Sequence, residues 1–377
     1  MSCISTEKID NRQLLFILFI MRTTVIISTL PVLTAGNAAQ DAWASALVSY
    51  VGSAILATAI GALGTRFPDL TLIQYGQKLI GRTPAKILSF VYLWAFLWVA
   101  AVDLRIYSEV LVTAFFPATP LVFIAGAMAV ASAYAAYAGI EAIGRNADFV
   151  FPIFFMTILA SLLAAIPQMR LTRLQPVLAR GLKPVLVGSI TPMTITLQVP
   201  VITVIAPSVL RPKKVVKTTI WALTGAHLVL TAASLATVGV LGAKPAARSV
   251  FPFFRMIRAI RLTEFLERFE ALVILPWGLG MFIGLSTSLY CCLKGLSQVF
   301  DLSDYRPLVG PMAAICITLS IHAAADIFQL RSFFRPETAG PYAFLLMLAP
   351  PAVLWPAYLA RRWMRKRPGS RKGGRQR

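Results

Sequence analysis

Three ionisable residues interrupt a long apolar stretch at positions 103, 105 and 109. Arg105 and Glu109 are four residues apart, so on a helix they lie on one face and can form an ion pair. Asp103 points to another face and needs a different partner, for which Arg22 is the candidate. Charges in an apolar interior either bind a ligand, cation or proton, or hold helices together, and both roles remain open for this cluster.

Two further stretches combine hydroxyl groups with proline. One covers residues 22–31 and the other residues 189–200. Proline donates no backbone hydrogen bond, so an unwound turn at either place would expose backbone donors and carbonyls. Facing helix ends can hold an amino acid, with N-termini on its carboxylate and C-terminal carbonyls on its ammonium group. The alternative is that these prolines and hydroxyls are ordinary helix kinks.

These stretches supply the candidate site residues. A third one, at residues 277–290, adds hydroxyls that either line the same cavity or form hydrogen bonds between helices, whereas its glycines favour close helix packing. We expect one group of side chains to bind a ligand: Thr24, Ser28, Thr29, Leu104, Ser108, Thr194, Gln198, Thr287 and Tyr290. A second group carries the intramembrane charge, with Arg105 and Glu109 as a coupling pair: Arg22, Asp103, Arg105 and Glu109.

The sequence offers no pattern typical of an enzyme. It has no phosphate-binding loop, nucleophile elbow or metal-binding histidine pair. His227 and His322 are far apart, and the four cysteines have no metal-ligand spacing. We therefore expect a non-enzymatic protein without a metal or cofactor.

The elements that must position these residues are ten apolar stretches. Hydrophobic residues form 58% of the chain and charged residues 14%, which is too apolar for a soluble globule. Each stretch has about the 20 residues that a helix needs to cross a bilayer, whereas a β-barrel would need shorter alternating segments. The predicted spans are 13–34, 42–63, 87–115, 120–139, 147–167, 185–209, 217–242, 271–293, 308–326 and 341–361.

The predicted fold class is an all-α integral membrane protein with about ten helices. Ten spans divide into five plus five, and an odd number in each half gives the halves opposite orientations. The first and sixth spans, which carry the proline breaks, are then equivalent. This is the inverted repeat of the leucine-transporter class, with helices 1 and 6 broken. Residues 1–362 form one permease-like domain, and 363–377 form a basic tail.

The net charge of +21 is concentrated at the membrane edge. Nine of the 36 basic residues follow position 360, which indicates contact with membrane lipids and no nucleic acid. Placing both termini in the cytoplasm puts 22 basic residues inside and 12 outside, as the positive-inside rule requires of a multi-pass protein. Lys8 and Arg12 before an apolar run also suggest a signal peptide, but Arg22 interrupts that run too early.

The order of motifs along residues 9–362 resembles the spore-germination permease family. The motifs are Leu30-Pro31, Gln40-Asp41-Ala42-Trp43, Arg66-Phe67-Pro68, Thr71-Leu72-Ile73, Ile80-Gly81-Arg82, Leu104-Arg105, Ser108-Glu109, Pro117 and Pro120, Gly139-Ile140-Glu141 with Arg145, Phe265-Leu266-Glu267-Arg268 with Glu270-Ala271, and the helix of Trp277.

The resemblance implies the B subunit of a nutrient germinant receptor. Such proteins are related to the amino acid-polyamine-organocation transporters. A subunit of this kind binds a nutrient such as an amino acid in the spore inner membrane, together with A and C subunits, and triggers germination. One departure concerns glycines usual in the first helix, which are here Thr23, Thr24 and Ile26. Bulkier residues and Arg22 suggest an unusual or acidic ligand.

Two rival functions fit the same pattern. The first is a cation- or proton-coupled secondary transporter of amino acids or amines, whose helices and pocket have the same sequence signature. The second is a structural membrane partner whose polar residues only join helices.

Overall fold

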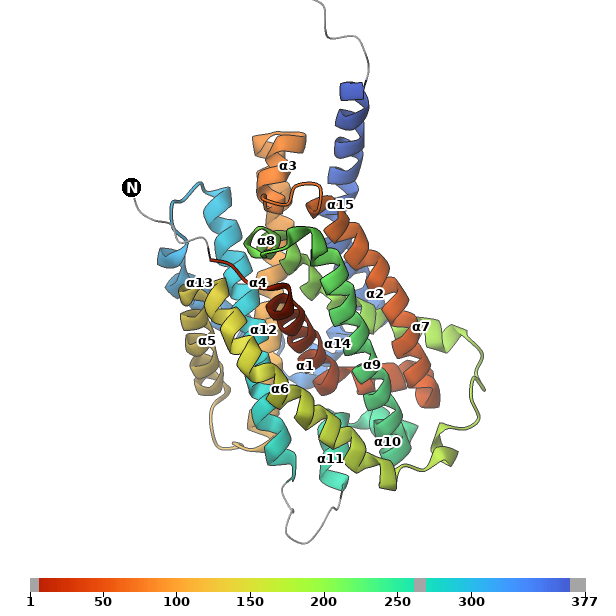
Figure 1. Ribbon diagram of the computed structural model, residues 1–377. Coiled ribbons are helices and arrows are strands. Elements are labelled where there is room, and N and C mark those ends of the chain that lie inside the picture. Colours follow the sequence, from red (N-terminus) through yellow and green to blue (C-terminus); the bar gives the residue numbers. More distant parts are fainter. Residues whose placement is uncertain (1–6, 261–268, 367–377) are drawn as a thin grey trace, which may run out of the picture.

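The computed structural model describes residues 7–260 and 269–366, and these residues are almost entirely helical. Figure 1 shows a bundle of long helices running roughly side by side. The helices on the predicted spans of the first half are α1 (Asn11–Ala38), α2 (Ala42–Gly64), α4 (Arg82–Ala114), α5 (Leu121–Ala138) and α6 (Ile140–Ala165). Those of the second half are α7 (Lys183–Thr194) with α8 (Ile202–Ile205), α9 (Val215–Leu241), α12 (Phe269–Val299), α13 (Val309–His322) and α15 (Pro336–Lys366).

This architecture confirms the predicted all-α membrane fold. Eight helices among the described residues are long and apolar enough to cross a membrane, and the bent pair of α13 and α14 (Ile327–Phe333) gives a ninth. The first predicted span falls on α1, whose side chains are described only in part. Each predicted span therefore has a helical counterpart, and the protein is a multi-pass membrane protein.

The two ends of the bundle are distinct. Short α3 (Leu72–Ile80) and the last turns of α15 lie at the upper end in Figure 1, near the start of the chain, and this end is called the terminal end below. Short α10 (Ala243–Arg248) and α11 (Pro252–Ala259) lie at the far end. Ile9 joins the N-terminal residues to the connection before α9, since its amide donates to Ser208 O at 2.9 Å.

Two tight corners depend on glycine. Gly81 links α3 to α4 with φ of 91°, and Gly139 links α5 to α6 with φ of 95°, a region that other residues rarely adopt. At Gly139 a Cβ atom would also collide with the Glu7 carboxylate, which accepts a hydrogen bond from the Ile140 amide at 3.0 Å. These corners let consecutive helices reverse direction almost without a linker.

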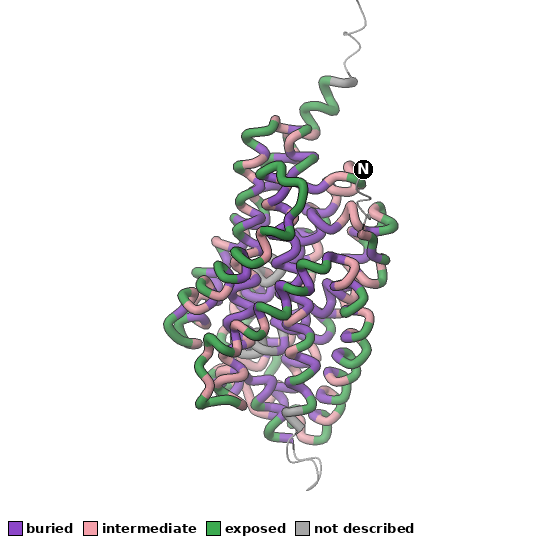
Figure 2. The backbone as a smooth tube through the Cα atoms, turned by 90° about the vertical axis from the view of Figure 1, so that its left-hand side faces the viewer, coloured by how far each residue is buried: buried purple, intermediate pink, exposed green. Residues whose placement is uncertain are grey.

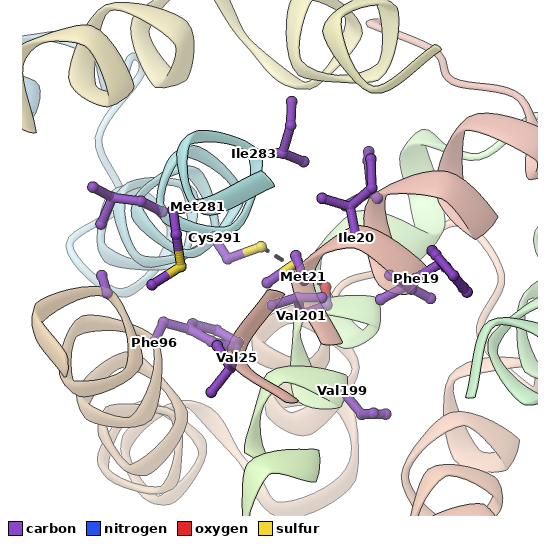
Figure 3. Packing of buried hydrophobic residues seen from close by; sticks show 14 of the residues in the cluster. Phe19, Ile20, Met21, Val25, Phe96, Val199, Val201, Met281, Ile283 and Cys291 are labelled. Atoms are coloured by element: carbon purple, nitrogen blue, oxygen red, sulfur yellow. Dashed lines mark hydrogen bonds between the residues drawn. The ribbon is translucent and has the colours of Figure 1, made fainter. Parts of the chain in front are cut away.

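The core is a column of apolar side chains around α1. Figure 2 shows buried residues through the centre of the bundle and exposed residues on its outer helices. In Figure 3, Val25 of α1 lies toward Phe96 of α4, while Cys291 of α12 is joined to the Val201 carbonyl. Outward-facing residues such as Ile55, Phe123 and Leu275 are between 65% and 71% exposed, as expected of side chains that face lipid.

The helix breaks differ from the prediction in two places. The sixth span is interrupted: α7 ends at Thr194 and a 3₁₀ segment, η4 (Ile195–Val201), leads to α8. The first span is not, because α1 continues through Pro31. Membrane helices tolerate an internal proline when neighbouring groups satisfy the freed carbonyl. The second break lies in the ninth span, where α13 and α14 meet at 96°.

Candidate functional site

A small cavity lies between the interrupted spans. It has a volume of about 50 Å³, room for roughly three or four water molecules. Its lining comes from α1, α4, η4 and the α14–α15 region, and one side chain of the lining is charged, that of Asp103. The lining residues are Val25, Trp98, Val99, Val102, Asp103, Gln198, Phe333, Phe334, Ala339, Tyr342 and Ala343.

Asp103 and Gln198 form the polar part of this cavity. Asp103 is 5% exposed, and Gln198 Nε2 donates to its Oδ2 at 3.4 Å. Gln198 Oε1 is buried and has no hydrogen-bond partner among the described residues. Two oxygen-bearing groups thus face one cavity in an apolar surrounding. A cation or an ammonium group is the kind of ligand that satisfies them, because an unpaired buried carboxylate is costly.

Aromatic rings form the opposite wall. Trp98 packs edge-on against Phe333, with ring centroids 5.4 Å apart, and Tyr342 lies 5.7 Å from Phe333. Trp94 Nε1 donates to the Tyr342 hydroxyl, which fixes that ring on α4. The faces and edges of such rings bind apolar side chains, and their faces also attract cations. The cavity therefore pairs one acidic end with an apolar, aromatic end.

The η4 segment results from two prolines. Pro192 and Pro200 donate no amide hydrogen bonds, so regular α-helix gives way to tighter 3₁₀ turns between them. The Pro192 carbonyl accepts a hydrogen bond from Arg22 at 2.5 Å. One residue earlier, Thr191 Oγ1 donates to Phe334 O at 3.1 Å. The break in the sixth span is thereby tied to the α14–α15 region.

Arg22 lies on the other side of this break, and Asp103 is not its partner. The Arg22 guanidinium donates to the Pro192 carbonyl and lies 3.3 Å from His227 Nε2. His227 Nδ1 bonds to the Leu223 carbonyl at 2.8 Å; a carbonyl only accepts, so Nδ1 carries the proton and Nε2 accepts from Arg22. Arg22 Nε and Nη1 are buried without partners in the described part of the chain.

Arg105 and Glu109 do form the predicted ion pair, at 2.7 Å. Arg105 also donates to the carbonyls of Ser320 and Ile321, at 3.4 and 2.8 Å, and to Ala325 O at 3.4 Å. These carbonyls lie at the C-terminus of α13 and in its connection to α14, where a helix carries partial negative charge. The pair on α4 therefore holds the bend of the ninth span, two residues from Asp103.

Other predicted ligand residues lie away from the cavity. Thr24, Ser108 and Thr287 each donate to a carbonyl of their own helix, at 2.6, 2.9 and 2.7 Å, a use of the hydroxyl that the sequence pattern does not reveal. Leu104 is buried in the core, and Tyr290 packs edge-on against Tyr305, with centroids 5.6 Å apart. The side chains of Ser28, Thr29 and Thr194 lie outside the described residues.

Sequence reasoning missed the aromatic wall and the second break. Phe333 and Tyr342 flank the border of the last predicted span, where aromatic residues are common for other reasons. A signal was present: Asp326 caps α14 by accepting from the Gln329 amide at 2.7 Å. An acid followed by glutamine three residues later is a helix-start pattern, and here it begins at the last residue of the predicted span 308–326.

A membrane bundle with interrupted helices around a central cavity is typical of transporter-like proteins. The solved structure of MhsT in complex with L-phenylalanine is similar, with a TM-score of 0.63, 14% identity, and coverage of 92% of this chain and 98% of MhsT. At that identity the likeness shows the fold alone, and it confirms the leucine-transporter-like class.

The family profile described as spore germination protein matches residues 8–327. The chain therefore belongs to the spore-germination permease family. Spore germination protein KB of Bacillus subtilis (strain 168) is 27% identical, covering 85% of this chain and 87% of that protein. Spore germination protein YndE of the same organism is 24% identical, with coverage of 83% and 86%. The family is one of permease-like membrane proteins and not of enzymes.

Proposed function

We propose that this protein is the B subunit of a spore germinant receptor, which binds a small nutrient with an ammonium group in the Asp103–Gln198 cavity. One observation carries the proposal: Asp103 is the charged side chain of a cavity whose other lining residues, apart from Gln198, are aromatic or aliphatic. An amino acid or amine would place its ammonium group on the Asp103 carboxylate and its side chain against Trp98 and Tyr342. The family membership supports the germination role.

The rest of the assignment follows from the family and the charge pattern. The protein would act in the spore inner membrane with both termini in the cytoplasm, together with A and C subunits, and ligand binding would trigger germination. Val25 lines the cavity, and Ser28 and Thr29 follow it by one helical turn. Thr194 precedes Gln198 by four residues. These three hydroxyl residues remain candidates for the polar head of the ligand.

Ligand binding would be coupled to the outer helices through Arg105 and Glu109. A nutrient in the cavity touches Phe333 and Phe334, which end and follow α14. The bend before α14 is held by Arg105, and the turn after it by Thr191. A change in the position of α14 would therefore be felt at both contacts, which gives the bound ligand a route to the outer helices.

The test is ligand-dependent thermal stability of purified protein, because a ligand that binds only the folded state raises the melting temperature. Amino acids and amines are compared with sugars and nucleosides. Asp103→Asn keeps the shape and the Gln198 contact but removes the charge. We expect its affinity for the active amine to fall about tenfold to hundredfold, the range for a hydrogen bond to a charged group.

The matched control is Asp301→Asn, which removes an acid at the terminal end, far from the cavity lining. It should leave ligand affinity unchanged. An Asp103→Asn protein that is folded and binds the same amine equally well contradicts the assignment of the cavity.

A cation- or proton-coupled amino acid or amine transporter is the second candidate. Gln198 Oε1, which has no hydrogen-bond partner among the described residues, lies beside a buried carboxylate. This arrangement favours the transporter, since such oxygens are ligands for a coupling ion. Net uptake of a labelled amino acid into vesicles that contain this chain alone, dependent on an ion gradient and lost in Asp103→Asn, would select the transporter. Binding without uptake selects the receptor.

A further inference from the structure

A second pocket, at the terminal end, is lined by cations. It has a volume of about 440 Å³, within the range of small-molecule sites, and lies between the α2–α3 connection, α3 and α15. Its lining consists of Arg66, Phe67, Lys78, Leu79, Tyr358, Arg361 and Arg362. The four charged residues come from three separate segments of the chain, and no acidic side chain is part of this lining.

The four cations have no protein partner among the described residues. Arg66, Lys78, Arg361 and Arg362 form no ion pair there, although Asp69 is only three residues from Arg66. Other cations at the same end behave differently, because Arg82 and Lys86 both bind Asp301, at 2.8 and 2.5 Å. Four like charges repel one another around a common space, so an anion that enters it is attracted by all of them.

The remaining walls are apolar and fixed. Phe67 stacks on Tyr75, with ring centroids 5.3 Å apart, and meets Tyr358 edge-on at 6.1 Å. Trp355 Nε1 donates to Ala59 O at 3.0 Å and so anchors α15 on α2. Ile55 and Leu359 next to this junction are 65% and 53% exposed, as lipid-facing side chains are. The pocket thus lies where apolar helix surface meets a cationic rim.

We propose that this pocket binds a phosphate group carried by a membrane lipid or by a soluble anion. Arginine and lysine are the side chains that bind phosphate, arginine through two parallel hydrogen bonds. Basic pockets between membrane helices at the cytoplasmic side bind anionic headgroups in the same way. The apolar walls and the position at the membrane edge favour a lipid, whose chains would follow the exposed side of α2 and α15.

The experiment compares lipids by native mass spectrometry of the full-length protein. Phosphatidylglycerol is titrated against phosphatidylcholine, for the unchanged protein and for Arg66→Gln/Lys78→Gln. Each removed cation weakens the attraction of an anionic lipid about fivefold, so the double variant should bind phosphatidylglycerol roughly 30-fold more weakly. Arg361→Gln/Arg362→Gln tests the opposite wall of the pocket and should give a loss of the same order.

Arg170→Gln/Arg180→Gln is the matched control, because it removes two exposed basic residues that do not line this pocket. It should keep the phosphatidylglycerol affinity. A second arm adds inorganic phosphate at constant ionic strength and records the melting temperature. A rise that Arg66→Gln/Lys78→Gln abolishes identifies a soluble phosphate ligand. Equal phosphatidylglycerol affinity of all three folded variants, without a phosphate-dependent rise, overturns the proposal.

Discussion

Two buried arginines of this protein are held in opposite ways. Arg105 has a carboxylate at 2.7 Å and donates to three backbone carbonyls. Arg22, only 2% exposed, has one carbonyl and one imidazole nitrogen, no carboxylate within ion-pair distance in the described residues, and two nitrogens without partners. A fully satisfied buried charge stabilises one arrangement of helices, whereas an unsatisfied one destabilises it and favours any state or ligand that supplies a partner.

The largest effect is therefore expected at Arg105. Glu109→Ala leaves a buried guanidinium without its carboxylate and should lower the unfolding free energy by about 3 to 5 kcal/mol. Denaturant unfolding in detergent measures this. Glu141→Ala is the matched control, because Glu141 and Arg145 form an ion pair of the same spacing that is largely exposed. That control should cost about 0.3 to 0.5 kcal/mol. Equal losses at both sites would mean that burial does not distinguish the pairs.

A smaller effect of opposite sign is expected at Arg22. Arg22→Met keeps the apolar stem and removes a charge that has no acidic partner, so the unfolding free energy should stay within about 1 kcal/mol of the original or rise. The same unfolding assay measures it. A loss of unfolding free energy as large as that of Glu109→Ala would show that both arginines stabilise the fold to the same extent. Loss of the nutrient response at unchanged stability would mark Arg22 as a functional residue.

The smallest effect concerns an acid outside the bundle. Hydrogen bonds from Lys86 and Arg82 hold the pKa of Asp301 below its usual value. The resulting stabilisation is present above the unfolded pKa of about 3.9 and is lost as pH falls through the lowered folded pKa. The melting temperature of Asp301→Asn should thus lie slightly below the original near neutral pH and converge with it in acid. A difference in melting temperature that grows as the pH falls would contradict a stabilising role of the Asp301 carboxylate.

The same contrast marks the limit of prediction from sequence. The ion pair of Arg105 and Glu109 follows from a four-residue spacing, because helix geometry alone brings the two side chains together. The surroundings of Arg22 do not follow from residue spacing, because Pro192 and His227 are far from it in the chain and meet it only through packing. Apolar length likewise predicted the helices, whereas the bend between α13 and α14 falls at the end of the predicted span 308–326, where Asp326 caps α14.

Two residues of the cavity lining stand out in the sequence for a related reason, Gln198 as a predicted ligand residue and Asp103 as a predicted intramembrane charge. Asp103 and Gln198 stand out as polar groups in apolar spans, and the structure brings them together. Thr24, Ser108 and Thr287 stand out equally, but a hydroxyl can satisfy itself on a carbonyl of its own helix and then needs no ligand. A carboxylate has no proton to donate in this way. Charged and amide side chains in apolar spans were accordingly better indicators of this cavity than hydroxyls.

Under the proposed function, the volume of the cavity also sets how sensitive the protein is to its nutrient. At about 50 Å³ it is too small for a nutrient of amino acid size, so a molecule can be accepted only by the fraction of proteins that are momentarily open. The apparent dissociation constant then equals the intrinsic one divided by that fraction. Under the proposed function, contacts remote from the ligand, such as Thr191 on Phe334 and Arg105 on α13, would thereby set the nutrient concentration at which the protein responds. The nutrient concentration needed for a response would then depend on how strongly these contacts hold α13 and the region after α14 in the closed arrangement.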